Sequence, residues 1–136
     1  MKKYRNKISG PLLDRIDIHI EVFNEKNSEY QYTENEKSAE IRKRVNIARK
    51  VQTERYKKYN VYSNSELSPK LISIFCKLNN ESEKILNKAM DRLKLSGRAY
   101  SKILKVARTI ADLEESENIK KEHLIEAIQY RSLDRK

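Results

Sequence analysis

One stretch of the chain, residues 96–113, carries a sustained helical repeat of apolar side chains. These residues recur at steps of three and four, the spacing that places side chains on one face of an α-helix, and they are Ala99, Ile103, Val106, Ala107, Ile110 and Leu113. The charged residues among them fall mostly off this face and are Lys102, Lys105, Arg108 and Asp112. The repeat predicts a central helix with one buried face and one polar face.

The beginning of this helix carries an unusual charge. Ser96 is a predicted N-cap, because its hydroxyl can accept a hydrogen bond from an amide of the first turn. Arg98 then lies in the first turn, where a cation opposes the positive end of the helix dipole. Amides at a helix N-terminus and an arginine fork both suit phosphate oxygens, so an anion beside Arg98 would explain its position. The alternative is a solvated surface arginine.

Composition favours one helical domain. The chain has 136 residues, enough for one modest core, and only two glycines and two prolines, which are few for a fold with many tight turns. No apolar run approaches the roughly 18 residues needed to span a bilayer, so no membrane is predicted as a partner. The single cysteine, Cys76, is predicted to be a reduced core thiol, and the predicted location is cytoplasmic.

Further helical repeats surround the central one. A helix is predicted over residues 38–59, a short one from Pro69, another from Asn80 with Glu83 as its capping-box partner, and a last one from about Lys120. With the central helix, these five segments predict a small α-helical bundle.

One segment has a different period. Between Ile16 and Val22 apolar and polar residues alternate strictly, which predicts a half-buried strand with His19 on its solvent side. No second run alternates in this way, and a single strand cannot satisfy its own hydrogen-bonding edges. The fold class predicted is therefore mainly α, preceded by one orphan β-strand whose partners are expected upstream of Met1.

The helix over 38–59 is strongly basic. Residues 31–59 hold nine basic and four acidic side chains, a net charge of +5 out of +10 for the chain. Such a helix can follow a phosphate backbone without reading bases, and the alternative is a solvated face. The candidate nucleic-acid residues are Arg42, Lys43, Arg49, Lys50, Lys57 and Lys58.

The remaining reactive side chains are sparse. His19, His123 and Cys76 have no spacing typical of a zinc site, so no metal ligands are assigned. His123, early in its helix, is interpreted as a capping or packing residue. No hydrolytic triad is assigned.

Two blocks of sequence resemble a known family. The first is Ser9-Gly10-Pro11-Leu12-Leu13-Asp14-Arg15-Ile16-Asp17, and the second runs from Leu95-Ser96-Gly97-Arg98-Ala99-Tyr100 through Arg108-Thr109-Ile110-Ala111-Asp112-Leu113 to the ending His123–Arg131. In this order they resemble the C-terminal portion of magnesium-chelatase-like AAA+ ATPases, most closely the ComM/YifB competence-protein branch. The resemblance covers nearly the whole chain and is least characteristic over 24–36 and 60–83.

The resemblance implies roles that spacing cannot supply. It implies that residues 1–30 are the last part of an ATPase core and that 31–136 form its helical lid. Arg15 matches an arginine finger that reaches the nucleotide of a neighbouring subunit, and Arg98 matches the sensor 2 residue that contacts the γ-phosphate. The alternative for Arg15 is a salt bridge to Asp14 or Asp17.

The same resemblance implies ATP and Mg²⁺ as cofactors, an N-terminal ATPase core and a homo-oligomer, expected to be a hexamer, as partners. The implied activity is a DNA-acting, helicase-like branch-migration motor of natural transformation. The chain holds no Gly-x-x-x-x-Gly-Lys-Ser/Thr loop, so it is not expected to hydrolyse ATP by itself. Two alternatives remain: an ATPase that inserts magnesium into a tetrapyrrole, and a non-enzymatic basic helical module that binds DNA.

Overall fold

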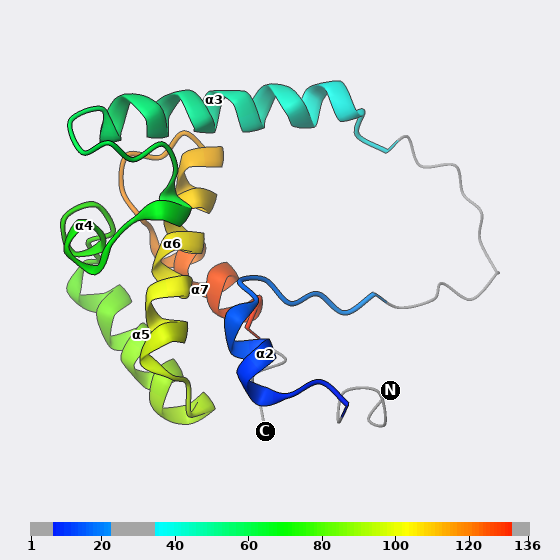
Figure 1. Ribbon diagram of the computed structural model, residues 1–136, viewed down its shortest axis with the longest axis vertical. Coiled ribbons are helices and arrows are strands. Elements are labelled where there is room, and N and C mark those ends of the chain that lie inside the picture. The colour runs from blue at the N-terminus through cyan, green and yellow to red at the C-terminus, as the bar shows by residue number, and fades with distance from the viewer. Residues whose placement is uncertain (1–6, 23–34, 132–136) are drawn as a thin grey trace.

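The computed structural model describes residues 7–22 and 35–131, and within these ranges the chain is a small helical bundle (Figure 1). In chain order the elements are α2 (Gly10–Arg15), α3 (Ser38–Tyr56), the 3₁₀ turn η1 (Asn64–Glu66), α4 (Pro69–Phe75), α5 (Asn80–Leu93), α6 (Gly97–Leu113) and α7 (Lys121–Gln129). The five predicted helical segments correspond to α3 through α7, so the predicted bundle is confirmed.

Helix α6 is the centre of the bundle. It packs against α3, η1, α4 and α7, and its residues Ile103, Ala107 and Ala111 are fully buried. Because alanine side chains are small, they let neighbouring helices approach α6 closely. The helix begins as predicted: the Ser96 hydroxyl accepts a hydrogen bond from the Ala99 amide at 3.1 Å.

The caps of the shorter helices follow the same chemistry. Ser68 caps α4 and Pro69 occupies its first turn, where the missing proline amide costs no hydrogen bond. The cap of α5 lies one position earlier than predicted, because the side chain of Asn79 rather than that of Asn80 accepts a hydrogen bond from the Ser82 amide, at 2.8 Å. The predicted start of the last helix, at about Lys120, agrees with α7.

Only the C-terminal half of α3 packs into the bundle. Ala48, Gln52 and Tyr56 are buried, whereas Ile41 near the start of the helix is 43% exposed. Figure 1 shows the N-terminal end of α3 extending past the other helices. The Tyr56 ring meets the edge of Phe75 in a T-shaped contact, with 5.1 Å between ring centroids. This aromatic contact fixes the end of α3 over α4.

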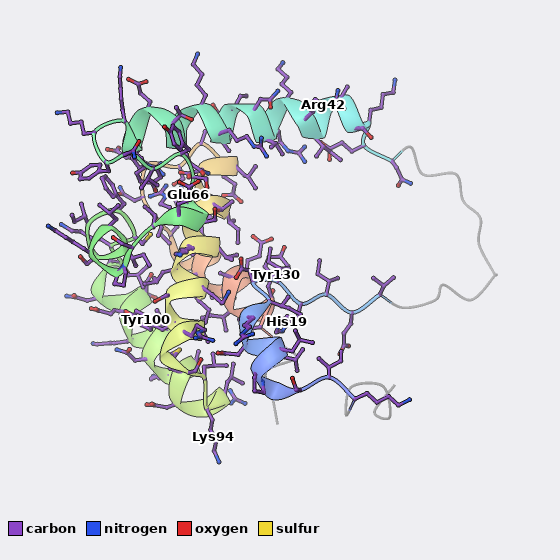
Figure 2. The ribbon with its side chains drawn as sticks, in the orientation of Figure 1. His19, Arg42, Glu66, Lys94, Tyr100 and Tyr130 are labelled. Carbon is purple, nitrogen blue, oxygen red and sulfur yellow. The ribbon has the colours of Figure 1, made fainter. Side chains whose placement is uncertain are left out.

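The predicted strand over 16–22 is wrong. These residues are extended, but the described part of the chain contains no strand, and the side chains of Ile16, Ile18, Ile20 and Val22 are at least 41% exposed. A strand needs a neighbour to share its hydrogen-bond ladder, and none of the described residues supplies one. The stretch is tied to the end of the bundle by a backbone hydrogen bond from the His19 amide to the Tyr130 carbonyl, at 2.7 Å (both residues are labelled in Figure 2).

The side predicted for His19 is also wrong. Its side chain is 5% exposed, and its Nε2 lies 3.1 Å from the Leu13 carbonyl oxygen. His19 therefore faces the bundle, whereas Asp17 and Glu21, on the same side of the alternating run, are exposed. The pattern of alternation was correct, but a face can be assigned only when the partner layer is known.

Within the described residues, no helix is both long and apolar enough to cross a bilayer.

Cys76 has the buried position predicted for it, and we expect it to be unreactive. Burial raises the pKa of its thiol to about 11, so the nucleophilic thiolate is scarce at pH 8. We predict that the folded chain reacts with a disulfide reagent at pH 8 about 10²-fold more slowly than the unfolded chain, measured by the release of the coloured thiolate. Equal rates would contradict the buried placement.

Candidate functional site

A groove lies along α6 between the extended residues 17–20 and the end of α7, with a volume of about 790 Å³. Its lining combines apolar side chains with charged side chains of both signs. The apolar lining residues are Ile18, Ile20, Val106, Ile110 and Leu113. The charged lining residues are Arg44, Arg98, Lys102 and Lys105, with Asp17, Glu114 and Glu126. Three of the four cations, Arg98, Lys102 and Lys105, come from α6.

Arg98 is one of the residues that line the groove. The Ser96 cap fixes the first turn of α6, and the Arg98 side chain is 60% exposed from that turn. Its Nη1 lies 3.6 Å from a carboxylate oxygen of Asp14, a distance typical of a loose ion pair. The structure therefore leaves this guanidinium accessible on the first turn of a helix.

Two further cations follow Arg98 on the same side of α6. Lys102 and Lys105 come one and two turns later, at the spacing that keeps side chains on one helix face. Lys102 Nζ donates to the Arg15 carbonyl at 3.1 Å and pairs with Asp17. Lys105 Nζ donates to the Ser65 carbonyl at 3.0 Å. Both lysines thus have protein acceptors, whereas Arg98 has only the loose contact with Asp14.

Arg15 ends α2 and is exposed. The two acids that could have paired with it are engaged elsewhere: Asp14 accepts a hydrogen bond from Ser96 and faces Arg98, and Asp17 pairs with Lys102. The salt-bridge alternative for Arg15 is therefore not the arrangement in this structure. Its role as an arginine finger stays a prediction, because it depends on a neighbouring subunit.

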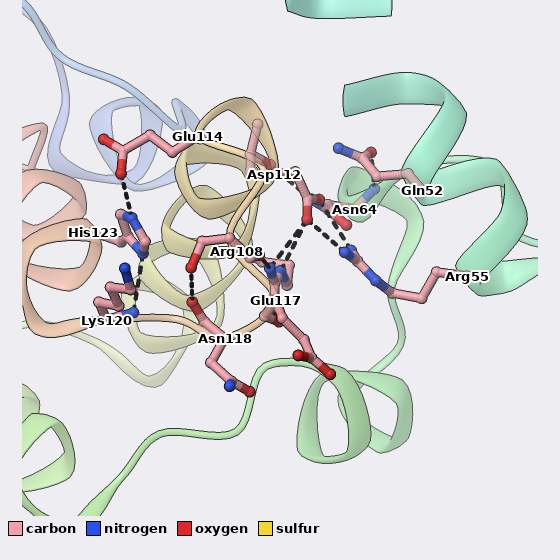
Figure 3. A network of polar contacts seen from close by, with 12 residues as sticks. Gln52, Arg55, Asn64, Arg108, Asp112, Glu114, Glu117, Asn118, Lys120 and His123 are labelled. Carbon is pink, nitrogen blue, oxygen red and sulfur yellow. Dashed lines mark hydrogen bonds and ion pairs between the residues drawn. The ribbon is translucent and has the colours of Figure 1, made fainter. Parts of the chain in front are cut away.

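Sequence reasoning missed the network of buried charges behind the groove (Figure 3). Asp112 is 1% exposed and accepts hydrogen bonds from both Arg55 nitrogens, at 2.5 and 3.0 Å, and from Arg108 Nε at 3.2 Å. Asn64 Nδ2 donates to the same carboxylate at 3.0 Å. One carboxylate thus joins α3, η1 and α6.

Each partner of Asp112 has further bonds that fix it. Arg108 donates to the carbonyls of Ser116 and Glu117 at 2.8 and 3.0 Å, which ties down the loop after α6. Asn64 accepts from the Tyr56 hydroxyl at 2.6 Å. Burial, the largest single effect, would lower the pKa of Arg55, but the hydrogen bonds and charges of Asp112 and Tyr56 together outweigh that cost and raise the pKa above its usual value.

Arg108 and Asp112 were placed off the buried face of α6, which was wrong for both, since their exposed fractions are 4% and 1%. Helix α6 has neighbours on several sides, so its buried arc is wider than one apolar stripe. The signal in the sequence that could have indicated this pair was the i, i+4 spacing of two opposite charges on one helix.

His123 has the capping role interpreted for it. Its Nδ1 accepts the Lys120 amide at 3.0 Å, and its Nε2 lies 2.7 Å from Glu114. The side chain is 1% exposed, so it holds the start of α7 against the end of α6. Among the described residues, no three histidine, cysteine or acidic side chains gather in a way that could hold a metal ion.

The basic helix divides into two parts. Arg55 turns inward to Asp112, while the six candidate nucleic-acid residues, Arg42, Lys43, Arg49, Lys50, Lys57 and Lys58, are all exposed. A shallow depression on the projecting half of α3 is lined by Ala39, Arg42, Lys43, Asn46, Ile47 and Lys50 (Arg42 is labelled in Figure 2). The structure thus brings three of the six cations together.

The family described as "Magnesium chelatase, subunit ChlI C-terminal" matches residues 35–131, and "Magnesium chelatase, subunit ChlI" matches residues 1–30. The chain belongs to the magnesium chelatase ChlI family. It is 45% identical to "Competence protein ComM" of Haemophilus influenzae over 135 residues, which are 98% of this chain and 26% of that protein.

Other relatives show the same coverage. The chain is 41% identical to "Uncharacterized protein YifB" of Escherichia coli over 98% of its length, and 30% identical to a protein of Mycobacterium tuberculosis, Rv2897c, over 82%. It spans about a quarter of the length of the curated relatives that it matches. The resemblance to magnesium-chelatase-like proteins of the ComM/YifB branch is confirmed.

Because Asp112 joins three elements, we predict that Asp112→Ala lowers the free energy of unfolding by about 3–5 kcal/mol, since it leaves the buried Arg108 and the partly buried Arg55 without their carboxylate. Denaturant unfolding measures this. The matched control is Asp91→Ala, an exposed acid on α5, which should change stability by less than about 0.5 kcal/mol. A similar small loss for Asp112→Ala would contradict the proposed importance of the network.

Proposed function

We propose that this chain is the helical lid, with the adjoining end of the core, of a ComM-like AAA+ ATPase that acts on DNA. The observation that carries the proposal is Arg98, an exposed guanidinium on the first turn of α6 that lines the groove. A planar guanidinium and helix N-terminal amides both suit phosphate oxygens. Membership of the ChlI family and 45% identity to a competence protein support this proposal.

In this proposal the nucleotide is held mainly by the core of the family, and this chain adds charge at its phosphates. Arg98 is the residue that fits the group: its guanidinium is accessible, and its loose contact with Asp14 can be exchanged for a phosphate oxygen. When bound, ATP with Mg²⁺ supplies the phosphoryl group whose charge Arg98 would stabilise. Arg15 would stabilise the phosphoryl charge of the nucleotide that a neighbouring copy holds.

Helix α6 would then transmit the state of the nucleotide. Arg98 lies at one end of this helix, and the buried carboxylate of Asp112 lies at the other end, bonded to α3. A rigid helix tied at its far end to the bundle moves as one body with it. We therefore infer that a shift of Arg98 towards the nucleotide rotates the whole lid.

The Arg98 proposal is tested in the assembled ATPase, by which we mean this chain joined to the nucleotide-binding core of the family. We predict that Arg98→Ala lowers the rate of ATP hydrolysis by about 10²-fold, the usual cost of removing one group that stabilises transition-state charge. Phosphate release measures the rate. The control, Arg92→Ala, removes an exposed arginine from the last turn of α5 and should leave turnover unchanged. Full activity of the Arg98→Ala variant would refute the assignment.

A second function is favoured by the geometry of α3. Its projecting half carries exposed cations around a shallow depression, and a phosphate backbone could lie against them without specific base contacts. We propose that this surface contacts DNA, either within the motor or as a binding module by itself.

We predict that the chain binds duplex DNA with affinity that falls steeply with salt. Changing Arg42, Lys43 and Lys50 together to Gln should weaken binding and reduce the salt slope by about 2–3, at roughly 0.9 per lost phosphate contact. Fluorescence anisotropy over a range of salt concentrations measures this. The matched control changes Lys84, Lys88 and Arg92, three exposed cations of α5, and alters net charge equally. Equal losses in both triple variants would indicate general charge attraction only.

A further inference from the structure

The residues around Arg15 are bonded to α6 and α7 at several points. We call residues 13–19 the Arg15 segment. His19 lies at its end, where the amide donates to the Tyr130 carbonyl at 2.7 Å, and the side chain of Arg131 bonds to the Ile16 carbonyl. At its start, the Ser96 hydroxyl donates to Asp14 at 2.7 Å. The segment is thus held by side chains and backbone of the helices that follow it by about 80 residues or more.

Lys102 makes the central contact with this segment. Its ammonium donates to the carbonyl of Arg15 itself at 3.1 Å and also pairs with Asp17. The Lys102 side chain is only 18% exposed, although Lys102 lies on the face of α6 that borders the groove. A lysine that is mostly covered and has two oxygen acceptors on one short segment holds that segment in place.

The acids on either side of Arg15 are both held by α6. Asp14 faces Arg98 and Ser96, and Asp17 faces Lys102. Neither carboxylate neutralises Arg15, so its guanidinium remains exposed while its backbone is fixed. Arg15 and Arg98 are therefore presented from one connected unit, with Lys102 one helical turn beyond Arg98.

We propose that Lys102 is a positioning residue that fixes Arg15 relative to Arg98, so that movement of α6 at the nucleotide moves the arginine offered to a neighbouring copy. This inference rests on the proposed function of Arg98 and Arg15. Lys102 itself touches no nucleotide: its ammonium is directed to the Arg15 carbonyl and to Asp17. The competing role for a lysine at this place is direct contact with phosphate. Loss of a phosphate contact would weaken ATP binding, whereas loss of a positioning residue would lower kcat and leave the Kd for ATP nearly unchanged.

The anchor is tested first in this chain by itself. Lys102→Met keeps the apolar stem and removes the donors. We expect the amides of Ile16 and His19, which donate to Leu13 and Tyr130, to exchange with solvent about tenfold faster, while the amides inside α6 keep their rates. The control, Lys105→Met, removes a lysine on the same helix that bonds to Ser65 instead, and it should leave Ile16 and His19 unchanged. Unchanged exchange in Lys102→Met would overturn the anchor.

The role in catalysis is tested in the assembled ATPase. We expect Lys102→Met to lower kcat by about tenfold and to leave the Kd for ATP within about twofold, because Lys102 acts only through Arg15. In an Arg15→Ala background, Lys102→Met should cause no further loss, since the group it positions is gone. Weakened ATP binding, or losses that simply multiply in the double variant, would overturn the positioning role.

The two proposals fail in different ways. If Arg98→Ala and Arg15→Ala both leave hydrolysis unchanged, the proposed function is refuted, and the catalytic role of Lys102 is refuted with it. The exchange result in the isolated chain would still decide whether Lys102 holds the segment. If Arg15→Ala and Arg98→Ala reduce turnover but Lys102→Met does not, the proposed function stands and this inference alone is overturned.

Discussion

The carboxylate of Asp112 is the interaction on which the rest of the bundle depends. It accepts hydrogen bonds from two arginines and one asparagine that come from three different elements. A buried charge is costly unless it is paired and its hydrogen bonds are satisfied, and here both conditions hold. The geometry of this site specifies how α3 and η1 sit against α6, because any other placement would leave buried charge unpaired.

The two ends of α6 therefore have different chemistry. At its C-terminal end, Arg108 and Asp112 are buried and fully engaged within the bundle. At its N-terminal end, Arg98 is exposed and only loosely paired with Asp14. A helix that is fixed at one end and presents an accessible cation at the other is well suited to sense an anion. The same helix also holds the Arg15 segment through Lys102, which places both predicted nucleotide-facing arginines on one unit.

Much of the fold could be predicted from the chain itself. The apolar periods of residues 38–128 indicated the five helices, and local chemistry placed the cap at Ser96 correctly. The groove was not predicted, because its walls come from α6, α7 and the extended residues 17–20, which are far apart in sequence. That Arg98 faces an anion was predicted from its position in a first turn and stays a prediction. The contact between Lys102 and Asp17 had no local signal in the sequence, because the two residues are far apart along the chain.

The amino-acid sequence by itself determined the helices, the cap at Ser96 and the exposure of Arg98, because these follow from neighbours within a few residues. Tertiary structure decided the burial of Arg108, Asp112 and His19 and the exposure of Ile18 and Ile20. Each of these depends on which surface lies opposite, and a charged or alternating pattern is compatible with either side until that surface is known. The opposite surface is supplied by partners distant in sequence, such as Arg55 for Asp112 and Tyr130 for His19.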